Sequence, residues 1–311
     1  MFRASVRVAA LILSCALALS LAVPASVQAA PPGFAFLEVP ATARAAALGG
    51  AYTAVAEGAE AAFWNPAGLA LGSGNQLSAT HAESFEGLKH DQVAFAGRMW
   101  GGGLAGSVRA MYSQPIEERD EIGNLIGSFG SHDLEFQAAF GHALGARARL
   151  GFGAQMVRER IASEAATTWS GSAGFSCEPA ALRGARVALV VQNVGPAANY
   201  VIDGQRGADV GLPMAVQGGA AWSRALQRGL TLGTSLDTRF TRGRQGVVAL
   251  GGELRSDVGA SLRLGWRFND DIANVSAGLG WVLGGASVDY AWVPSKLDLG
   301  DTHRFSLGAR F

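Results

Sequence analysis

The sequence contains few cysteines, and their positions exclude two kinds of cross-linked fold. Only two cysteines are present among its 311 residues. Cys15 lies in an N-terminal segment that we expect to be removed on export, which leaves Cys177 without a partner for an internal disulfide. Two cysteines also cannot supply the closely spaced ligand sets of structural zinc sites. Neither a disulfide framework nor a structural zinc site is therefore expected.

Charge is also scarce, and neither sign predominates. Asp, Glu, Lys and Arg make up 16% of the residues, with 25 basic and 25 acidic side chains. This zero balance gives no electrostatic reason to expect a nucleic-acid partner, because nucleic-acid-binding proteins carry basic surfaces. So small a charged fraction is unusual for a soluble exported protein.

Long apolar runs are missing except near the N-terminus. Arg3 and Arg7 precede an apolar run at residues 8–23, and small residues follow up to Ala29. We interpret residues 1–29 as a secretory signal peptide; the alternative, a membrane anchor, would need a longer run and a stop-transfer cluster. Beyond this segment no run reaches the ~18 residues of a membrane helix. The exported chain is then either an apolar-rich soluble protein or a membrane β-barrel.

Alternation of apolar and polar residues dominates the chain after residue 75. In residues 261–268, Leu264 and Trp266 fall on the apolar side, whereas Arg263 and Arg267 fall on the polar side. A period of two is typical of strands with one apolar and one polar face. It predicts roughly fourteen strands, near residues 75–82, 90–100, 103–113, 131–142, 146–160, 166–177, 183–194, 212–224, 228–240, 243–255, 257–268, 272–282, 284–293 and 302–311.

The links between these predicted strands alternate in length. Every second link is short, such as "WGGG" and "ALQR", and the others tend to be longer, such as "SQPIEERDEIGNLIGSFGS". An outer-membrane barrel has short periplasmic turns on one rim and long loops on the other. Aromatic residues fall mostly toward strand ends, where they favour the head-group level. We therefore predict an all-β fold, a transmembrane antiparallel β-barrel of about 14 strands over residues 75–311, in a Gram-negative-type outer membrane.

The final predicted strand carries an apolar side formed by Phe305, Leu307 and Phe311. We expect it to pair with the first strand, because closure of the barrel removes the exposed edges that a sheet otherwise leaves. Phe311 is further expected to serve as the signal by which the barrel assembly machinery recognises the chain.

Residues 30–74 interrupt the alternation. They are rich in alanine, with helix-like stretches near 41–48 and 57–63, and Asn65, Pro66 and Gly68 break the second stretch. A fourteen-stranded barrel is wider than the roughly eight-stranded size that side chains alone fill. Glycines on the polar side of the strands, such as Gly151, fit a crowded lumen. We expect residues 30–74 to form a partly helical hatch inside the barrel.

Three segments resemble one known family. The run "ARAAALGGAYTAVAEGAEAAFWNPAGLA" at residues 43–70 resembles the N-terminal signature of PorV/PorQ-family outer-membrane proteins, relatives of the FadL long-chain fatty acid transporters. "VQNVGPAANYVIDGQRGADVGLPMAVQGGAAW" and "LGDTHRFSLGARF" resemble that family's middle and ending. The resemblance implies a fourteen-stranded barrel whose hatch is shaped by Arg44, Leu48, Gly49, Gly50, Asn65, Pro66 and Gly68.

No pattern in the sequence predicts catalysis, a metal site or a cofactor. Gly101, Gly103 and Gly106 match the dinucleotide-binding spacing, but a strand pattern follows where that motif needs a helix. The five histidines lack metal-ligand spacing. His303 and Ser306 are the best candidates for a hydrolase pair, and they have no evident third group. Charges on the polar side, including Arg109, Glu135, Glu253 and Arg263, are expected to form structural ion pairs.

Two functions remain open. One is passive transport of hydrophobic small molecules such as fatty acids, with ligand contacts at Phe34, Phe36 and Leu37. The other, which the family signature favours, is a non-enzymatic role in type IX-like protein export, with a secretion translocon and exported cargo as partners. In that case the loop at residues 114–131 would present an apolar binding patch, formed by Ile116, Ile122, Leu125, Ile126 and Phe129. The alternative is that these residues pack down over the pore mouth. In either case the surrounding partner is outer-membrane lipid.

Overall fold

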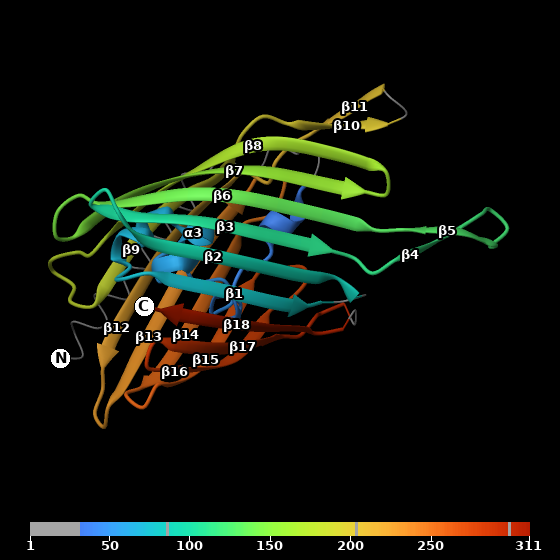
Figure 1. Ribbon diagram of the computed structural model, residues 1–311. Coiled ribbons are helices and arrows are strands. Elements are labelled where there is room, and N and C mark those ends of the chain that lie inside the picture. Colours follow the sequence, from blue (N-terminus) through green and yellow to red (C-terminus); the bar gives the residue numbers. More distant parts are fainter. Residues whose placement is uncertain (1–31, 85–86, 203–204, 298–299) are drawn as a thin grey trace.

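The computed structural model describes residues 32–84, 87–202, 205–297 and 300–311. The predicted signal peptide, residues 1–29, lies outside the described residues. Within the described part, fourteen strands form a closed antiparallel barrel in the order β1-β18-β17-β16-β15-β14-β13-β12-β9-β8-β7-β6-β3-β2 (Figure 1). The predicted fold class is thus confirmed.

Each predicted strand corresponds to one strand of the barrel, with ends that differ by up to four residues. The barrel strands are β1 (Gln76–Glu83), β2 (Lys89–Met99), β3 (Gly102–Tyr112), β6 (Ser131–Ala143), β7 (Ala148–Ile161), β8 (Glu164–Cys177), β9 (Ala185–Val194), β12 (Ala215–Ala225), β13 (Leu230–Thr241), β14 (Val247–Ser256), β15 (Ala260–Phe268), β16 (Val275–Leu283), β17 (Ala286–Val293) and β18 (Thr302–Arg310).

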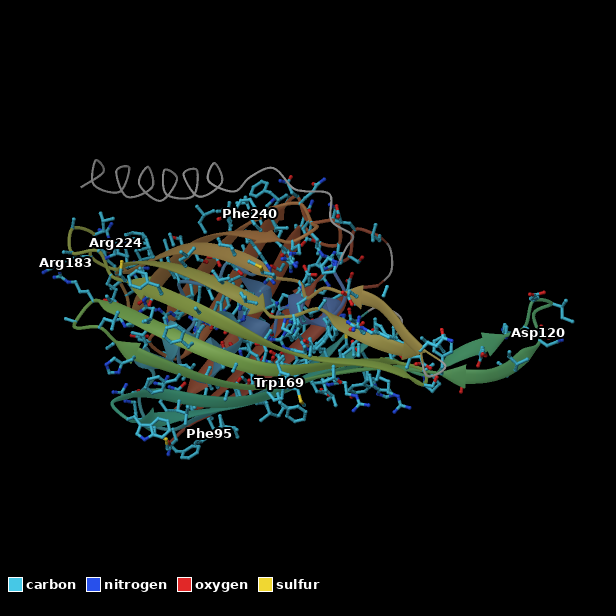
Figure 2. The ribbon with its side chains drawn as sticks, turned by 90° about the horizontal axis from the view of Figure 1, so that it is seen from above. Phe95, Asp120, Trp169, Arg183, Arg224 and Phe240 are labelled. Atoms are coloured by element: carbon cyan, nitrogen blue, oxygen red, sulfur yellow. The ribbon has the colours of Figure 1, made fainter. Side chains whose placement is uncertain are left out.

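The two faces of each strand are segregated as the alternation predicts. On β15, Leu264 is 59% exposed on the outer face, whereas the neighbouring Arg263 is 4% exposed toward the lumen. Phe95 and Trp169 lie on the same apolar outer surface (Figure 2). An apolar exterior around a polar interior is the arrangement of an outer-membrane barrel, where lipid replaces water outside the wall.

The two rims of the barrel differ in their connections. We call turn rim the end formed by residues 100–101, 144–147, 178–184, 226–229, 257–259 and 284–285, and loop rim the opposite end. Two hairpins, β4 (Ile116–Arg119) with β5 (Leu125–Phe129) and β10 (Ala198–Ile202) with β11 (Gln205–Val210), extend from the loop rim (Figure 1). The link between β7 and β8 is an exception to the predicted alternation, because only Ala162 and Ser163 separate these strands at the loop rim.

The barrel closes between β1 and β18. These strands pair from Gln76 with Arg310 to Glu83 with His303. At the turn rim, Asn75 N donates to Phe311 O at 2.8 Å and Phe311 N donates to Asn75 O at 3.0 Å. Phe305, Leu307 and Phe311 lie exposed on the outer face. Recognition of Phe311 by the assembly machinery stays a prediction.

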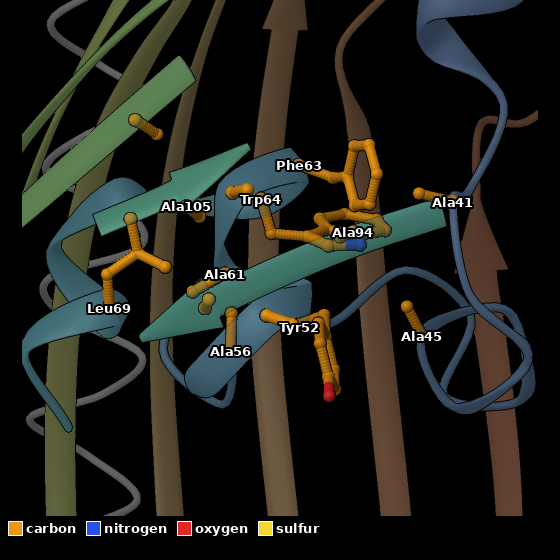
Figure 3. Packing of buried hydrophobic residues seen from close by; sticks show 14 of the residues in the cluster. Ala41, Ala45, Tyr52, Ala56, Ala61, Phe63, Trp64, Leu69, Ala94 and Ala105 are labelled. Carbon is orange, nitrogen blue, oxygen red and sulfur yellow. The ribbon is translucent and has the colours of Figure 1, made fainter. Parts of the chain in front are cut away.

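Five short helical segments precede β1. They are η1 (Ala35–Glu38), α2 (Ala43–Ala47), η2 (Gly58–Glu60), α3 (Ala61–Trp64) and η3 (Pro66–Leu71). Their apolar side chains pack on one another and on small residues of β2 and β3, notably Ala94 and Ala105 (Figure 3). None of the described helices is both long and apolar enough to cross a membrane. We call residues 33–72 the hatch.

Candidate functional site: the hatch and the luminal cavities

The hatch extends along the lumen from the loop rim to the turn rim. At its beginning, Phe34 N donates to Glu159 Oε2 at 2.8 Å, near the loop-rim end of β7. At its end, η3 packs against β3, β6, β7 and β8 near the turn rim, where Arg98 Nη1 donates to Ala70 O at 3.4 Å. The hatch therefore divides the lumen rather than covering one opening.

The turn that follows α2 explains why Gly49 and Gly50 occur in the segment that resembles the PorV/PorQ signature. Gly50 N donates to Ala45 O at 2.9 Å and Gly49 N donates to Ala46 O at 3.0 Å, which is the bonding pattern of a Schellman C-cap. Gly49 and Gly50 have φ of 67° and 81°, a region that glycine adopts without a steric penalty.

This turn lies directly against glycines of the barrel wall. A Cβ added at Gly265 of β15 would lie 2.2 Å from Gly49 N, and one at Gly251 of β14 would lie 3.0 Å from the Cβ of Leu48. A larger residue at Gly265 would push the turn out of place, whereas at Gly251 the turn would have to move by only a few tenths of an ångström. The expectation that glycines on the polar side serve a crowded lumen is confirmed at these positions.

The second half of the signature shapes η3. Asn65 accepts a hydrogen bond from Ala67 N at 3.1 Å, and Pro66 occupies the first turn, as helix starts favour. The Asn65 amide also donates to Thr53 O at 3.2 Å. Gly68 is needed because an added Cβ would lie 2.2 Å from Ala56 O. These contacts fold residues 53–68 into one compact unit.

An ion-pair network joins the hatch to the wall. Arg44 contacts Glu253 of β14 through two bonds, Nε to Oε1 at 3.0 Å and Nη2 to Oε2 at 2.8 Å. Glu253 also accepts from Arg263 at 2.6 Å, and Arg263 reaches Asp289 at 2.5 Å. Arg109 and Glu135 pair at 2.9 Å elsewhere in the lumen. The expected structural pairing of the luminal charges is confirmed for these groups.

A buried carboxylate on β13 holds the middle of the hatch. Asp237 Oδ2 accepts from Tyr52 N at 3.0 Å, from Thr53 N at 2.8 Å and from Gln217 Nε2 at 2.8 Å. Within the hatch, the Tyr52 hydroxyl donates to Glu60 Oε2 at 2.6 Å. Burial raises the pKa of Tyr52 well above its ordinary value and also raises that of Glu60. The Tyr52 phenol is therefore neutral near neutral pH and acts as the donor.

The first segment of the hatch is held by basic side chains of the wall. Arg109 Nη1 lies 3.5 Å from both Phe36 O and Leu37 O, and Arg304 of β18 donates to Pro40 O. Glu38 forms an ion pair with Arg244 at 2.9 Å. Phe34, Phe36 and Leu37 are buried in a cluster with residues such as Val157 and Leu212. Of these three predicted ligand contacts, Phe36 also lines a cavity of about 710 Å³ near the loop rim. Their contact with a ligand stays a prediction.

Two cavities lie on opposite sides of the hatch. The outer cavity, of about 710 Å³, lies near the loop rim and is bordered by Phe36, Gly49, Gly50 and Trp64 from the hatch. The inner cavity, of about 500 Å³, lies near the turn rim and is bordered by Arg44 and Leu48. Residues 44–50 thus separate the two spaces, so that movement of α2 and its C-terminal turn would join them.

The basic side chains in the outer cavity fall into two groups. Arg244 and Arg267 form ion pairs with Glu38 and Asp270, whereas other basic groups there do not. Arg304 is 3% exposed, and neither it nor Arg239 of β13 forms an ion pair with a carboxylate among the described residues. Arg304 Nε, Arg239 Nη2 and both ring nitrogens of His90 are buried without a hydrogen-bond partner there. His90 and Arg304 flank Ala82 in one row across β2, β1 and β18. Buried unpaired polar groups are costly, so the cavity is suited to a ligand with an acidic group.

The structure brings together most of the predicted hatch residues but separates the other sets. Arg44, Leu48, Gly49 and Gly50 form the partition between the cavities, whereas Asn65, Pro66 and Gly68 lie nearer the turn rim. Sequence reasoning missed Arg239, Arg304, His90 and Asp237. Their position on the polar side of predicted strands was the only signal, and many other residues share it.

The predicted partner loop forms the hairpin β4–β5, which projects beyond the loop rim (Figure 1). Ile122 at its tip is 85% exposed, and Ile116, Leu125 and Ile126 are also exposed. Hydrogen bonds from the Asn124 side chain and backbone hold the pKa of Asp120 below its ordinary value and order the tip. The alternative that this loop folds down over the pore is excluded in the described conformation.

The candidate hydrolase pair does not form. His303 lies on the outer face of β18, where its Nδ1 is 2.8 Å from the Tyr290 hydroxyl. Ser306 faces the lumen, where its hydroxyl is 2.7 Å from that of Thr80 and accepts from Ala43 N. Among the described residues, no group of three or more His, Cys, Asp or Glu side chains could hold a metal ion.

A closed antiparallel barrel with an apolar exterior and an internal hatch is a fold that several solved outer-membrane proteins share. Solved structures with this fold include the monoaromatic hydrocarbon channel CymD, with a TM-score of 0.59, 12% identity and coverage of 88% of this chain and 98% of that chain. The toluene transporter TbuX of Ralstonia pickettii gives a TM-score of 0.57, 12% identity and coverage of 87% and 98%. A FadL homologue of Pseudomonas aeruginosa gives a TM-score of 0.55 and 12% identity, with coverage of 88% of this chain and 98% of that chain. At these identities the similarity establishes the fold alone.

Sequence comparisons add less. The model of an uncharacterised protein family (UPF0164) matches residues 19–157, which is less than half of the chain. Comparison with curated proteins found no match. The barrel fold is that of outer-membrane proteins, as expected, whereas the resemblance to PorV/PorQ proteins rests on the sequence motifs.

Proposed function

We propose that this protein is an outer-membrane transporter that admits hydrophobic small molecules with an acidic group, such as fatty acids. The observation that carries the proposal is the outer cavity, about 710 Å³ in volume. Among the described residues, Arg239 and Arg304 form no ion pair there, and they and His90 have buried nitrogens without a hydrogen-bond partner. Its size lies within the range of about 300–1,000 Å³ that small-molecule sites occupy. Similar barrels that are named as toluene and hydrocarbon transporters support the broader role.

Transport through the lumen requires the hatch to move. Residues 44–50 separate the outer and inner cavities and are held by hydrogen bonds and ion pairs rather than by covalent bonds. A ligand in the outer cavity would displace the contacts that Arg304 makes with Pro40. Movement of the first hatch segment would then loosen α2, which follows it directly.

A disulfide lock tests the need for hatch movement. Leu48→Cys with Gly251→Cys joins the hatch turn to β14, in a Cys177→Ser background, because the two Cβ positions lie 3.0 Å apart and a small adjustment reaches disulfide geometry. Cells expressing the reduced variant are expected to take up labelled decanoate, and oxidation is expected to abolish uptake. The Leu48→Cys single variant should not respond to oxidation. Equal uptake by the oxidised and reduced double variants would contradict transport past the hatch.

Ligand chemistry is tested separately by binding. Purified protein is expected to retain decanoate more strongly than decanol in native mass spectrometry, and Arg304→Gln should remove most of this difference. Arg242→Gln is a suitable control, because this exposed arginine lies at the loop rim outside the cavity. Equal retention of the acid and the alcohol by the unmodified protein would rule out an acidic ligand.

A second candidate, a PorV-like role in protein export, is favoured by the β4–β5 hairpin. Its exposed apolar residues lie far from the lumen, where a transport role does not need them. We expect Ile122→Ser with Leu125→Ser and Ile126→Ser to reduce co-purification of exported cargo without changing decanoate binding. Unchanged cargo recovery would argue against this second function.

A further inference from the structure

The turn rim carries an excess of arginine that ion pairing does not neutralise. Its arginines with no carboxylate within ion-pair distance in the described structure are Arg98, Arg147, Arg183, Arg224, Arg228 and Arg310. All of these side chains are exposed. Arg98 also donates to Ala70 O of the hatch, and Arg147 and Arg183 also border the inner cavity. The acidic residues near the same rim are Glu178, which pairs with Arg149 and Arg186, Asp257, and Glu57 of the hatch.

The opposite end of the barrel carries acidic and basic residues together. The β4–β5 hairpin alone presents Glu117, Glu118, Asp120 and Glu121. Figure 2 shows Arg183 and Arg224 at one end of the molecule and Asp120 at the other. The chain also contains only the lysines Lys89 and Lys296, both toward the loop rim. The basic groups of the turn rim are therefore all guanidinium groups, which bind phosphate through two parallel hydrogen bonds.

Five of these six arginines, all except Arg183, are accompanied by an exposed large apolar residue on the same turn or strand end. Arg98 precedes Trp100, which is 77% exposed, Arg147 follows Leu144, and Arg310 precedes Phe311. On the β12–β13 turn, exposed Leu226 lies between Arg224 and Arg228. An apolar group beside a cation is suited to the membrane interface, where one side contacts acyl chains and the other contacts head groups.

The distribution of these groups around the rim favours lipid over a single protein partner. They occur on the β2–β3, β6–β7, β8–β9 and β12–β13 turns and at the end of β18. A protein partner would need only one patch, whereas lipid surrounds the whole barrel. Short turns place this rim on the periplasmic side, next to the phospholipid leaflet.

We propose that the turn-rim arginines bind the phosphate groups of anionic phospholipids, with the adjacent apolar side chains inserted among the acyl chains. The β12–β13 turn allows the sharpest test, because no side-chain hydrogen bond is found for Arg224 or Arg228 in the described structure. Their replacement should therefore leave the fold intact.

The test uses the full-length protein in nanodiscs of equal phosphatidylglycerol and phosphatidylethanolamine, released for native mass spectrometry. The unmodified protein should retain phosphatidylglycerol severalfold over phosphatidylethanolamine. Arg224→Gln with Arg228→Gln should weaken this retention by roughly fivefold per arginine at low ionic strength. Arg224→Lys with Arg228→Lys should keep most of it.

The matched control is Arg158→Gln with Arg242→Gln, which removes two exposed arginines from the loop rim. This variant should retain phosphatidylglycerol as the unmodified protein does. Equal loss in the two glutamine variants, loss in the lysine variant, or no preference in the unmodified protein would each overturn the proposal. Retention of an acidic protein in place of lipid would also overturn it.

Discussion

Arg44 of the hatch and Glu253 of the barrel wall form a two-point ion pair, with contacts of 3.0 Å and 2.8 Å. The pair links residues 209 positions apart in the chain. It lies beside the turn that separates the two cavities, so it stabilises the partition of the lumen as well as the fold.

Removing this pair should loosen the hatch without unfolding the barrel. Arg44→Gln is expected to reduce the free energy of hatch docking by about 1.5–3 kcal/mol, the range for hydrogen bonds to charged groups. Glu253 keeps Arg263 as a partner, which limits the loss. Hydrogen–deuterium exchange should show faster exchange in residues 43–64 and unchanged exchange in the strands. Arg255→Gln, whose contact with Glu253 is longer at 3.5 Å, serves as the control and should leave the hatch protected.

A methyl group added to the wall should displace the hatch turn. Gly265→Ala places a Cβ where the backbone of Gly49 now lies, and overpacking of this kind costs about 1–3 kcal/mol. Gly252→Ala is the matched control, because no atom lies within 4 Å of its added Cβ. Guanidinium titrations followed by Trp fluorescence should separate the two variants. Similar midpoints would show that the turn does not depend on this close approach.

A charge on the outer face should destabilise the barrel in a bilayer. Leu264→Arg is expected to cost about 2–4 kcal/mol in a refolding titration, as for arginine near the bilayer midplane. Leu264→Ala removes the same side chain without adding charge and should cost less. From the alternation alone, replacing Arg263 by Leu would be expected to have a mild effect. The structure contradicts this, because Arg263 is buried between Glu253 and Asp289. Its loss would leave Asp289 without an ion pair among the described residues, although Glu253 would keep Arg44.

The docked hatch should become less stable as the pH rises from acid to neutral. Burial raises the pKa of Glu60 above its ordinary 4.5, although the Tyr52 hydrogen bond and Arg44 lower it. Above pH 4.5 an undocked Glu60 loses its proton while the docked residue still holds one, so docking loses free energy with rising pH until the docked carboxyl also ionises.

Glu60→Gln should remove this pH dependence, because the amide keeps an acceptor for Tyr52 and does not titrate. The ratio of hatch exchange rates between the unmodified protein and Glu60→Gln, taken at each pH, cancels the intrinsic pH dependence of exchange. This ratio should increase between pH 4.5 and pH 7. A constant ratio would mean that Glu60 does not couple to docking.

The barrel could be predicted from the sequence because each strand carries its own signal. Leu264 and Arg263 differ in polarity at adjacent positions, and lipid on one side and a packed lumen on the other enforce that difference along every strand. The position of the β4–β5 hairpin in the chain could be predicted, but its projection away from the barrel could not. In the sequence, an exposed apolar loop residue such as Ile122 cannot be distinguished from one that packs over the pore.

The site was less predictable because it depends on registers between distant strands. The sequence indicates that Arg304 and His90 face the lumen, but only the pairing of β18, β1 and β2 sets them on either side of Ala82. The partition between the cavities could not be predicted for the same reason, because Gly49 and Gly265 come into contact only when the hatch lies inside the barrel. A motif such as "ALGGAY" points to a tight turn without identifying the wall that it contacts.

The path of the hatch along the lumen also constrains the order of assembly. Phe34 lies at the loop rim and β1 begins at the turn rim, so the hatch between them lies along the lumen that the strands enclose. If β1 paired with β18 before the hatch was inside, the hatch would have to enter the closed barrel through a narrow lumen lined by glycines. Assembly is simpler if the sheet forms around the hatch and the pairing of β1 with β18 is completed last.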